Sequence, residues 1–156
     1  MRRRRGGQSI KSMAEARYAI IASRFNTEIV DRLISGARTG LTQSGVEWEK
    51  VPIFKVPGAF EIPIAVKKAA LSGKFDAILA IGCVIRGETP HFEYISNYVS
   101  LGIGQVGLET GIPVSFGVLT VNTDEQAMAR SDDNAENKGF EAALAAIEMV
   151  NLLRQI

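Results

Sequence analysis

The chain has 156 residues, of which 46% are hydrophobic and 22% are charged, so it is long enough to bury a core as one globular domain. No apolar run reaches membrane-spanning length, and a single cysteine excludes an internal disulfide framework, so we expect a cytoplasmic protein. One histidine and one cysteine are too few for a zinc site built on those ligands, and we expect no metal.

Four consecutive arginines, Arg2–Arg5, dominate the charge of the first residues. Removing these four charges from the net +1 leaves −3 for the rest of the chain. No apolar stretch follows them, so the segment is not a secretory signal. We interpret residues 1–15 as a basic, disordered tail and residues 16–156 as a single domain. A nucleic-acid-binding arm is the alternative, but no aromatic residues interleave with the arginines and no second basic cluster follows.

Short apolar runs and helical spacings alternate along the rest of the chain. The apolar runs predict strands at residues 18–22, 51–56, 77–81 and 114–121. Apolar residues at helical spacing predict helices from about residue 29 to Gly45, then at 62–71, 90–110 and 125–129, and from 138 onward with Phe140, Leu144, Ile147 and Val150 facing inward. This alternation predicts a three-layer α/β/α sandwich around a four-stranded parallel sheet.

The carboxyl ends of parallel strands share one edge of a sheet, and ligands bind there. The segments expected at that edge are 23–26, 57–61, 82–91 and 116–122, and most of the unusual residues of the chain fall in them.

Two of these segments carry an aromatic or acidic side chain next to small residues. Phe25 can stack on a flat heterocycle, or it can fold back over the first helix. Ala59, Phe60 and Glu61 follow Pro57-Gly58, where a backbone can approach a ligand closely. The carboxylate of Glu61 is also explained by its favourable place in the first turn of a helix.

Gly82 and Gly87 bracket the segment after the third strand, either as ordinary turn residues or as part of an anion cradle. Thr89 is placed to cap the helix that starts at Pro90, whose exposed N–H groups favour an anion. His91 follows at once. An imidazole suits proton transfer near neutral pH, although a lone histidine can equally be structural.

Two cations and one thiol complete the candidate residues. Arg130 and Lys138 flank a polar loop and can neutralise a phosphate, or they can be solvated surface charges. We interpret Cys83 as a small buried apolar residue rather than a nucleophile. No Walker loop, dinucleotide fingerprint or serine elbow is present.

Taken together, these segments resemble lumazine synthase, the flavodoxin-like enzyme family of the penultimate step of riboflavin biosynthesis. The resemblance covers about residues 16 to 154. The segments that match in order and spacing are 23–26, 56–63, 82–91, 116–120, Glu125-Gln126-Ala127 with Arg130, and Asn137-Lys138-Gly139.

The family condenses 5-amino-6-(D-ribitylamino)uracil with 3,4-dihydroxy-2-butanone 4-phosphate, without a cofactor. The products are 6,7-dimethyl-8-ribityllumazine, orthophosphate and water. The resemblance implies that His91 is the proton carrier and that three groups bind the butanone phosphate, namely Glu88, Thr89 and Arg130. It also implies a site for the ribitylaminouracil made by Phe25, Ala59, Phe60, Glu61, Cys83, Val84, Ile85, Lys138 and Phe116, the last supplied by a neighbouring subunit.

The resemblance further implies a homopentamer, and a 60-subunit icosahedral capsid of twelve pentamers, because the spacing from Arg130 to Lys138 shows no insertion. Riboflavin synthase is a candidate cargo of such a capsid, and we expect no membrane partner. The stretch 8–15 does not resemble the first strand of many icosahedral members, and residues 131–136 are unusually acidic. The alternatives are a catalytically weak flavin- or lumazine-binding paralogue and a purely shell-forming one.

Overall fold

The computed structural model describes residues 15–156, and its centre is a four-stranded sheet in which all strands are parallel. The strands are β1 (Tyr18–Ser23), β2 (Ile53–Val56), β3 (Ala77–Ile85) and β4 (Val114–Val121), in the order β2-β1-β3-β4. The predicted basic tail and the stretch 8–15 lie outside the described residues apart from Glu15.

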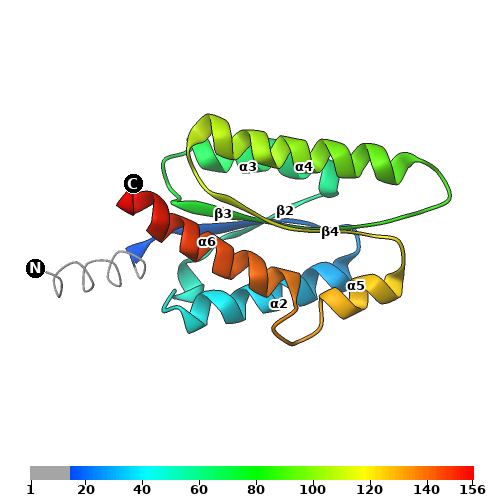
Figure 1. Cartoon of the computed structure of the whole chain (residues 1–156), viewed down its shortest axis with the longest axis horizontal. Coiled ribbons are helices and arrows are strands. Elements are labelled where there is room, and N and C mark those ends of the chain that lie inside the picture. The colour runs from blue at the N-terminus through cyan, green and yellow to red at the C-terminus, as the bar shows by residue number, and fades with distance from the viewer. Residues whose placement is uncertain (1–14) are drawn as a thin grey trace, which may run out of the picture.

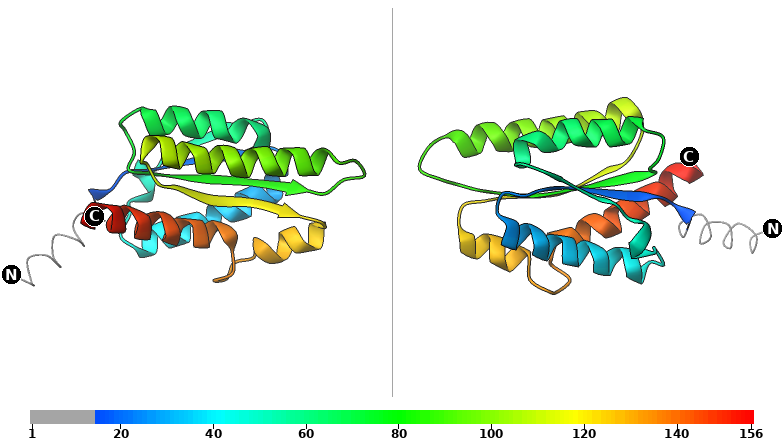
Figure 2. Two further views of the ribbon diagram at one scale, coloured as in Figure 1. Left: turned by 45° about the horizontal axis from the view of Figure 1, so that its top comes forward. Right: turned by 180° about the vertical axis from the view of Figure 1, so that it is seen from behind.

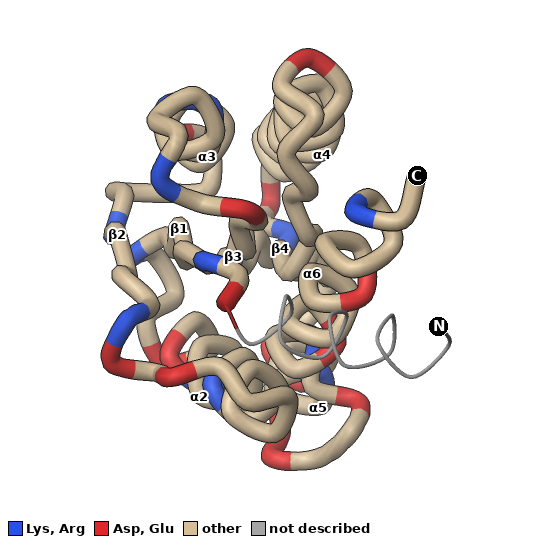
Figure 3. Tube along the Cα trace, turned by 90° about the vertical axis from the view of Figure 1, so that its left-hand side faces the viewer, with Lys and Arg blue, Asp and Glu red and all other residues tan. Residues whose placement is uncertain are grey.

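Helices cover both faces of the sheet (Figures 1 and 2). The helices α3 (Ile62–Leu71) and α4 (His91–Thr110) lie on one face. The helices α2 (Thr27–Gln43), α5 (Asp124–Arg130) and α6 (Lys138–Gln155) lie on the other. Two short 3-10 turns, η1 (Trp48–Lys50) and η2 (Ala59–Glu61), precede strands or helices. The predicted α/β/α sandwich with a parallel sheet is confirmed, and the layers are clear when viewed end-on (Figure 3).

The two central strands are apolar on both faces because helices cover both. All six residues of β1 and the first seven of β3 are buried. Ile20 and Leu79 pack toward α2 and α6, while Ile21 and Ile78 pack toward α3 and α4. The alternation of side chains along a strand therefore builds one core on each side of the sheet. None of the helices within residues 15–156 has the length and apolar character needed to cross a membrane.

One predicted boundary is wrong at the edge that matters for the site. Strand β3 was predicted to end at residue 81, but residues 82–85 continue it, paired in register with residues 118–121 of β4. Gly82 had suggested a loop. It lies in the strand because Ser23 and Ile62 approach it closely, and a Cβ there would lie 3.0 Å from a side-chain atom of each. The loop that follows β3 is therefore shorter than predicted, beginning at Arg86.

The inward face of α6 was also partly mispredicted. Ile147 and Val150 are buried as predicted and Phe140 is half-buried, but Leu144 is 41% exposed. Alanines occupy the buried face instead, namely Ala142, Ala143 and Ala146. Small side chains are required there because α6 packs closely on α2 at Ala143 and on β4 at Ala142, where Gly40 and Gly117 leave no space for a longer side chain.

Glycines mark the closest approach of α6 to α2. A Cβ on Gly139 would lie 1.8 Å from the carbonyl oxygen of Leu33, and a Cβ on Gly40 would lie 2.8 Å from the Cβ of Ala143. Backbone atoms cannot yield as a flexible side chain does, so the first turn of α6 rests directly on the backbone of α2.

We predict that Gly139→Ala lowers the free energy of unfolding by about 1–3 kcal/mol, since the added methyl group must push the two helices apart. The control is Ser35→Ala, at an exposed position within α2. There the substitution changes the free energy of unfolding by less than about 0.5 kcal/mol. Urea unfolding at equal protein concentration measures both. Equal midpoints for the two variants would show that the α2–α6 contact is not tight.

Candidate active site

The segments that follow the four strands come together at one edge of the sheet, at the right-hand side of Figure 1. They are the turn before α2, the 3-10 turn η2, the loop from residue 86 to 90, and the turn that leads into α5. Parallel strands require this convergence, and the crevice outside their carboxyl ends is the usual binding position in such folds.

Phe25 projects from the first of these segments, with 70% of its surface exposed. The alternative that it folds back over α2 is therefore wrong. Its neighbour Asn26 adopts a left-handed backbone (φ 61°, ψ 47°), which asparagine tolerates better than most residues. The Asn26 Nδ2 donates to the Cys83 carbonyl oxygen at 2.8 Å, so the turn is tied to the end of β3. Asn26 acts in this way as a support for Phe25 that the sequence alone did not single out.

The turn after β2 supplies a second aromatic ring. Phe60 is half exposed and stacks on Tyr98 of α4, with ring centroids 4.4 Å apart. Ala59 is buried, and Glu61 is partly exposed at the start of α3 with no side-chain capping bond. The helix start therefore does not use this carboxylate as a cap, which leaves it free to face the edge.

The end of β3 presents backbone more than side chains. Cys83 is 2% exposed and its thiol lies in the core between the sheet and α2, where burial, with a smaller effect of the Asp124 carboxylate, raises its pKa to about 11. The interpretation as a buried apolar residue is confirmed. A ligand at the edge would meet Cys83 only through its backbone. Val84 and Ile85 are half-buried on opposite faces of the strand.

His91 is the first residue of α4 and is exposed, as are Glu88 and Thr89 before it. The prediction that Thr89 caps this helix is wrong. Pro90 is the N-cap residue, and no side chain makes a capping bond there. The Glu93 N–H donates to the Pro90 carbonyl oxygen at 3.0 Å, so the N–H groups of His91 and Phe92 are the ones left for another partner, which suits an anion.

A positioning role that sequence reasoning missed belongs to Arg86. Its Nε donates to the Asn122 side-chain oxygen at 2.8 Å, and its Nη1 lies 3.3 Å from the Glu93 carboxylate. The guanidinium also lies 4.7 Å from the ring centroid of Phe92. These contacts join the end of β4 to the first turn of α4 and hold the turn that begins with His91. The signal available in the sequence was an arginine shortly after a predicted buried strand.

Arg130 ends α5 and Lys138 begins α6, so the two predicted cations flank the intervening loop as expected. Both are partly or fully exposed. The Arg130 Nη1 donates to the carbonyl oxygen of Gln126 at 3.1 Å, and the Lys138 ammonium lies 2.9 Å from the Glu141 carboxylate. Each keeps most of its hydrogen-bonding capacity for a ligand.

Phe116 does not lie with the other candidates. It is the third residue of β4, is paired in register with Ala80, and is about half exposed on the edge strand. Its placement among strand-end residues was wrong, since it lies near the start of β4, although the bounds of that strand, 114–121, were predicted correctly. Within one subunit, Phe116 therefore does not belong to the candidate site, and its predicted role requires the site of a neighbouring subunit.

The described residues contain no group of three or more His, Cys, Asp or Glu side chains that could hold a metal ion. The edge offers aromatic surfaces, the carboxylates of Glu61 and Glu88, the imidazole of His91, the open first turn of α4, and two cations. This set suits an uncharged planar ring together with a phosphate.

Comparison with known proteins shows which family has this sequence. A family model described as 6,7-dimethyl-8-ribityllumazine synthase matches residues 15–154. The chain belongs to this family. A curated relative named 6,7-dimethyl-8-ribityllumazine synthase, from Syntrophus aciditrophicus (strain SB), is 53% identical over 140 residues, which cover 90% of this chain and 91% of the relative. The match therefore includes every strand and helix that forms the edge described above, and the resemblance found in the sequence is confirmed.

Proposed function

We propose that this chain condenses 5-amino-6-(D-ribitylamino)uracil with 3,4-dihydroxy-2-butanone 4-phosphate to give 6,7-dimethyl-8-ribityllumazine, orthophosphate and water. Membership of the lumazine synthase family carries this proposal. The convergence of the segments that carry Phe25, Glu61 and His91 at the carboxyl edge of the sheet supports it. The reaction belongs to riboflavin biosynthesis. A lone buried thiol fits the reducing cytoplasm.

The chemistry needs positioning and proton transfer more than an exotic nucleophile. A primary amine of the uracil attacks the ketone, and the carbinolamine loses water to form an imine. Phosphate then leaves as orthophosphate to give an enol, and the enol tautomerises to a second ketone. The ribitylamino nitrogen attacks this carbonyl, and loss of a second water closes the ring. A protein that aligns the two substrates and supplies one acid–base group has sufficient equipment.

The edge divides into two halves in this proposal. In the half for the ribitylaminouracil, Phe25 stacks on the ring, and the exposed Phe60 and the partly exposed Glu61 lie across from it on the turn after β2. The same half includes Ala59, Cys83 through its backbone, Val84, Ile85 and Lys138. In the half for the butanone phosphate, the open first turn of α4 with Glu88 and Thr89 accepts the phosphate together with Arg130.

The proposed assembly is a pentamer in which Phe116 of one subunit completes the site of the next. The outer surface of α4 supports it, because Tyr94, Tyr98, Leu101 and Leu108 recur on one side of the helix and are exposed, Leu108 by 90%. Such an apolar stripe marks an interaction surface. The unbroken spacing from Arg130 to Lys138 supports a capsid of twelve pentamers, with riboflavin synthase as a candidate cargo.

We predict that native mass spectrometry of the full chain gives a 60-subunit particle, and pentamers as the smallest species during its dissociation. The exposed stripe on α4 would otherwise face water along its whole length, which is unfavourable. A monomer with full turnover would contradict the pentamer, whereas free pentamers as the final state would contradict only the capsid.

We predict that His91→Gln lowers turnover clearly without abolishing it. Removing a positioned acid–base group costs about a hundredfold to ten-thousandfold, and this reaction falls at the small end because amines and ketones condense in water. Lumazine formation, followed by its fluorescence, measures turnover across a range of pH. The wild-type assay also tests the function itself, because a protein that binds both substrates but forms no lumazine would contradict it.

The control for His91 is binding of the uracil substrate, which should stay within about twofold because alignment survives the loss. Unchanged turnover and an unchanged pH profile in His91→Gln, with chemistry rate-limiting, would assign His91 a structural role.

We predict that Arg130→Ala raises the Michaelis constant for the butanone phosphate by about tenfold to a hundredfold, from the ~1.5–3 kcal/mol of a charge-assisted hydrogen bond. The matched control is Arg38→Ala, which removes an exposed guanidinium from the far half of α2, where it lies over the Trp48 ring. Binding of the uracil substrate should not change in either variant. An equal loss for both substrates would contradict a phosphate role for Arg130.

A further inference from the structure

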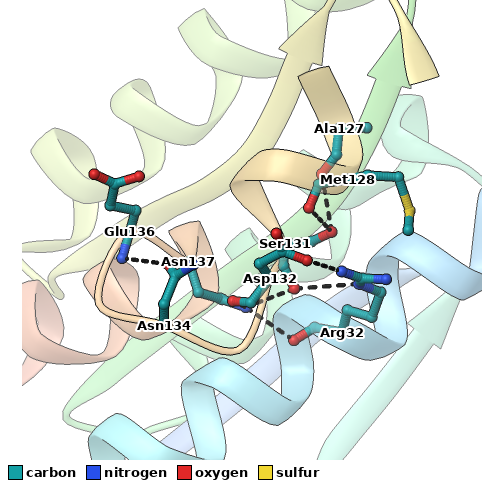
Figure 4. A network of polar contacts seen from close by, with 8 residues as sticks. All are labelled: Arg32, Ala127, Met128, Ser131, Asp132, Asn134, Glu136 and Asn137. Carbon is teal, nitrogen blue, oxygen red and sulfur yellow. Dashed lines mark hydrogen bonds and ion pairs between the residues drawn. The ribbon is translucent and has the colours of Figure 1, made fainter. Parts of the chain in front are cut away.

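The loop between α5 and α6 runs from Arg130 of the proposed phosphate half to Lys138. Asn137 is the last residue of this loop and the N-cap of α6, and its side chain lies among the polar contacts drawn in Figure 4. This side chain is 2% exposed, although six of the seven residues from 131 to 137 are polar or charged and most are in solvent. A buried amide of this kind is stable only when its hydrogen bonds are satisfied.

Asn137 satisfies all of them with backbone groups from three separate elements. The two N–H groups of its Nδ2 are shared among three acceptors, the carbonyl oxygens of Arg32 at 3.2 Å, Ser131 at 3.0 Å and Asp132 at 3.0 Å. Its Oδ1 accepts from the backbone N–H groups of Gly139 at 2.8 Å and Phe140 at 3.1 Å. The amide thereby caps α6 and ties the residue after α5 to α2.

The backbone of α2 leaves no free space beside this amide. A Cβ on Gly36 of α2 would lie 2.1 Å from the Asn137 Oδ1, so α2 approaches the amide as closely as a glycine permits. Arg32 strengthens the same attachment. Its Nε donates to the Ser131 carbonyl oxygen at 3.3 Å, and its Nη2 pairs with the Asp132 carboxylate.

The partners of Asn137 lie next to candidate site residues in the sequence. Ser131 directly follows Arg130, and Lys138 directly follows Asn137. One hydrogen bond, from Nδ2 of Asn137 to the carbonyl of Ser131, therefore joins the backbones next to the two cations. The contact with Asp132 and the Arg32 pair also hold an acidic residue of the loop against α2.

We propose that Asn137 is a positioning residue for phosphate binding, which fixes the backbone directly after Arg130 so that the guanidinium of Arg130 lies where the phosphate binds. It acts through the backbone and touches no substrate. This inference rests on the proposed function, because it assigns a support to the phosphate half of the same site. A bidentate contact between a guanidinium and a phosphate depends on the position of the arginine, so a small movement of the loop weakens phosphate binding.

The decisive variant is Asn137→Asp. A carboxylate keeps the shape of the side chain and an oxygen that caps α6, but it places an acceptor where Nδ2 donated to three carbonyl oxygens. The cap survives while the attachment of the loop is lost. The matched control is Asn134→Asp in the same loop, where the exposed side chain only accepts from the backbone N–H of Glu136, and aspartate can do the same.

The measurement is competitive inhibition by inorganic phosphate against the butanone phosphate, on the purified full-length assembly. Asn137→Asp should raise the inhibition constant of phosphate and the Michaelis constant of the butanone phosphate by about tenfold or more. The turnover number at saturation and the dissociation constant of the uracil substrate should change less than threefold. Asn134→Asp, which adds the same charge nearby, should change every constant less than twofold.

Three results would overturn the proposal. One is a wild-type phosphate constant in Asn137→Asp. Another is an equal rise in Asn134→Asp, which would reduce the effect to added charge. The third is a parallel loss for both substrates, as general destabilisation would give. If Asn137→Asp does not fold, Asn137→Ser replaces it in the same test, since a serine hydroxyl still caps α6 but cannot hold three carbonyl groups.

Wild-type protein and Arg130→Ala are assayed beside these variants. Failure of the wild type to form lumazine would overturn the proposed function. Normal catalysis with a phosphate constant that Arg130→Ala raises and Asn137→Asp does not would overturn only the positioning role of Asn137.

Discussion

Parallel pairing of β1 and β3 is the constraint on which the rest of this structure depends. Because both strands are buried on both faces, every connection between strands must cross a face of the sheet as a helix. Each helix then begins at the same edge where its preceding strand ended. Three segments that are far apart in the sequence meet there: a turn with an exposed aromatic side chain, the open N-terminus of a helix, and a loop flanked by two cations.

The sheet positions those segments, but side-chain hydrogen bonds to backbone give them their final geometry. Asn26 ties the Phe25 turn to the end of β3, Arg86 ties the first turn of α4 to β4, and Asn137 ties the α5–α6 loop to α2. In each case a polar side chain that need not meet substrate satisfies backbone or side-chain oxygens of a distant segment. Rigid support of this kind is what a reaction governed by alignment requires.

Periodicity predicted the elements well and their ends less well. The apolar runs and helical spacings placed four strands and five helices, because burial on two faces or one leaves a strong pattern. The end of strand β3 was predicted too early because glycine is typical of turns. Gly82 lies within the strand, where the close approach of Ser23 and Ile62 requires a residue without a side chain. Leu144 was placed inward by spacing, but the close approach of α6 to α2 selects the alanine face instead.

The sequence predicted those site residues whose own side-chain chemistry and position along the chain indicate a role. Phe25, His91 and Arg130 stand out by residue type and by their position after strands or at helix ends. Asn137 did not, because nothing in its neighbourhood along the chain shows that Gly36 and Arg32, about a hundred residues earlier, will lie against it. Residues that bind substrates are recognised by their own chemistry. Residues that position them are recognised only once the fold has brought their partners together, which makes the buried amide at the start of α6 a property of the structure and not of the motif around it.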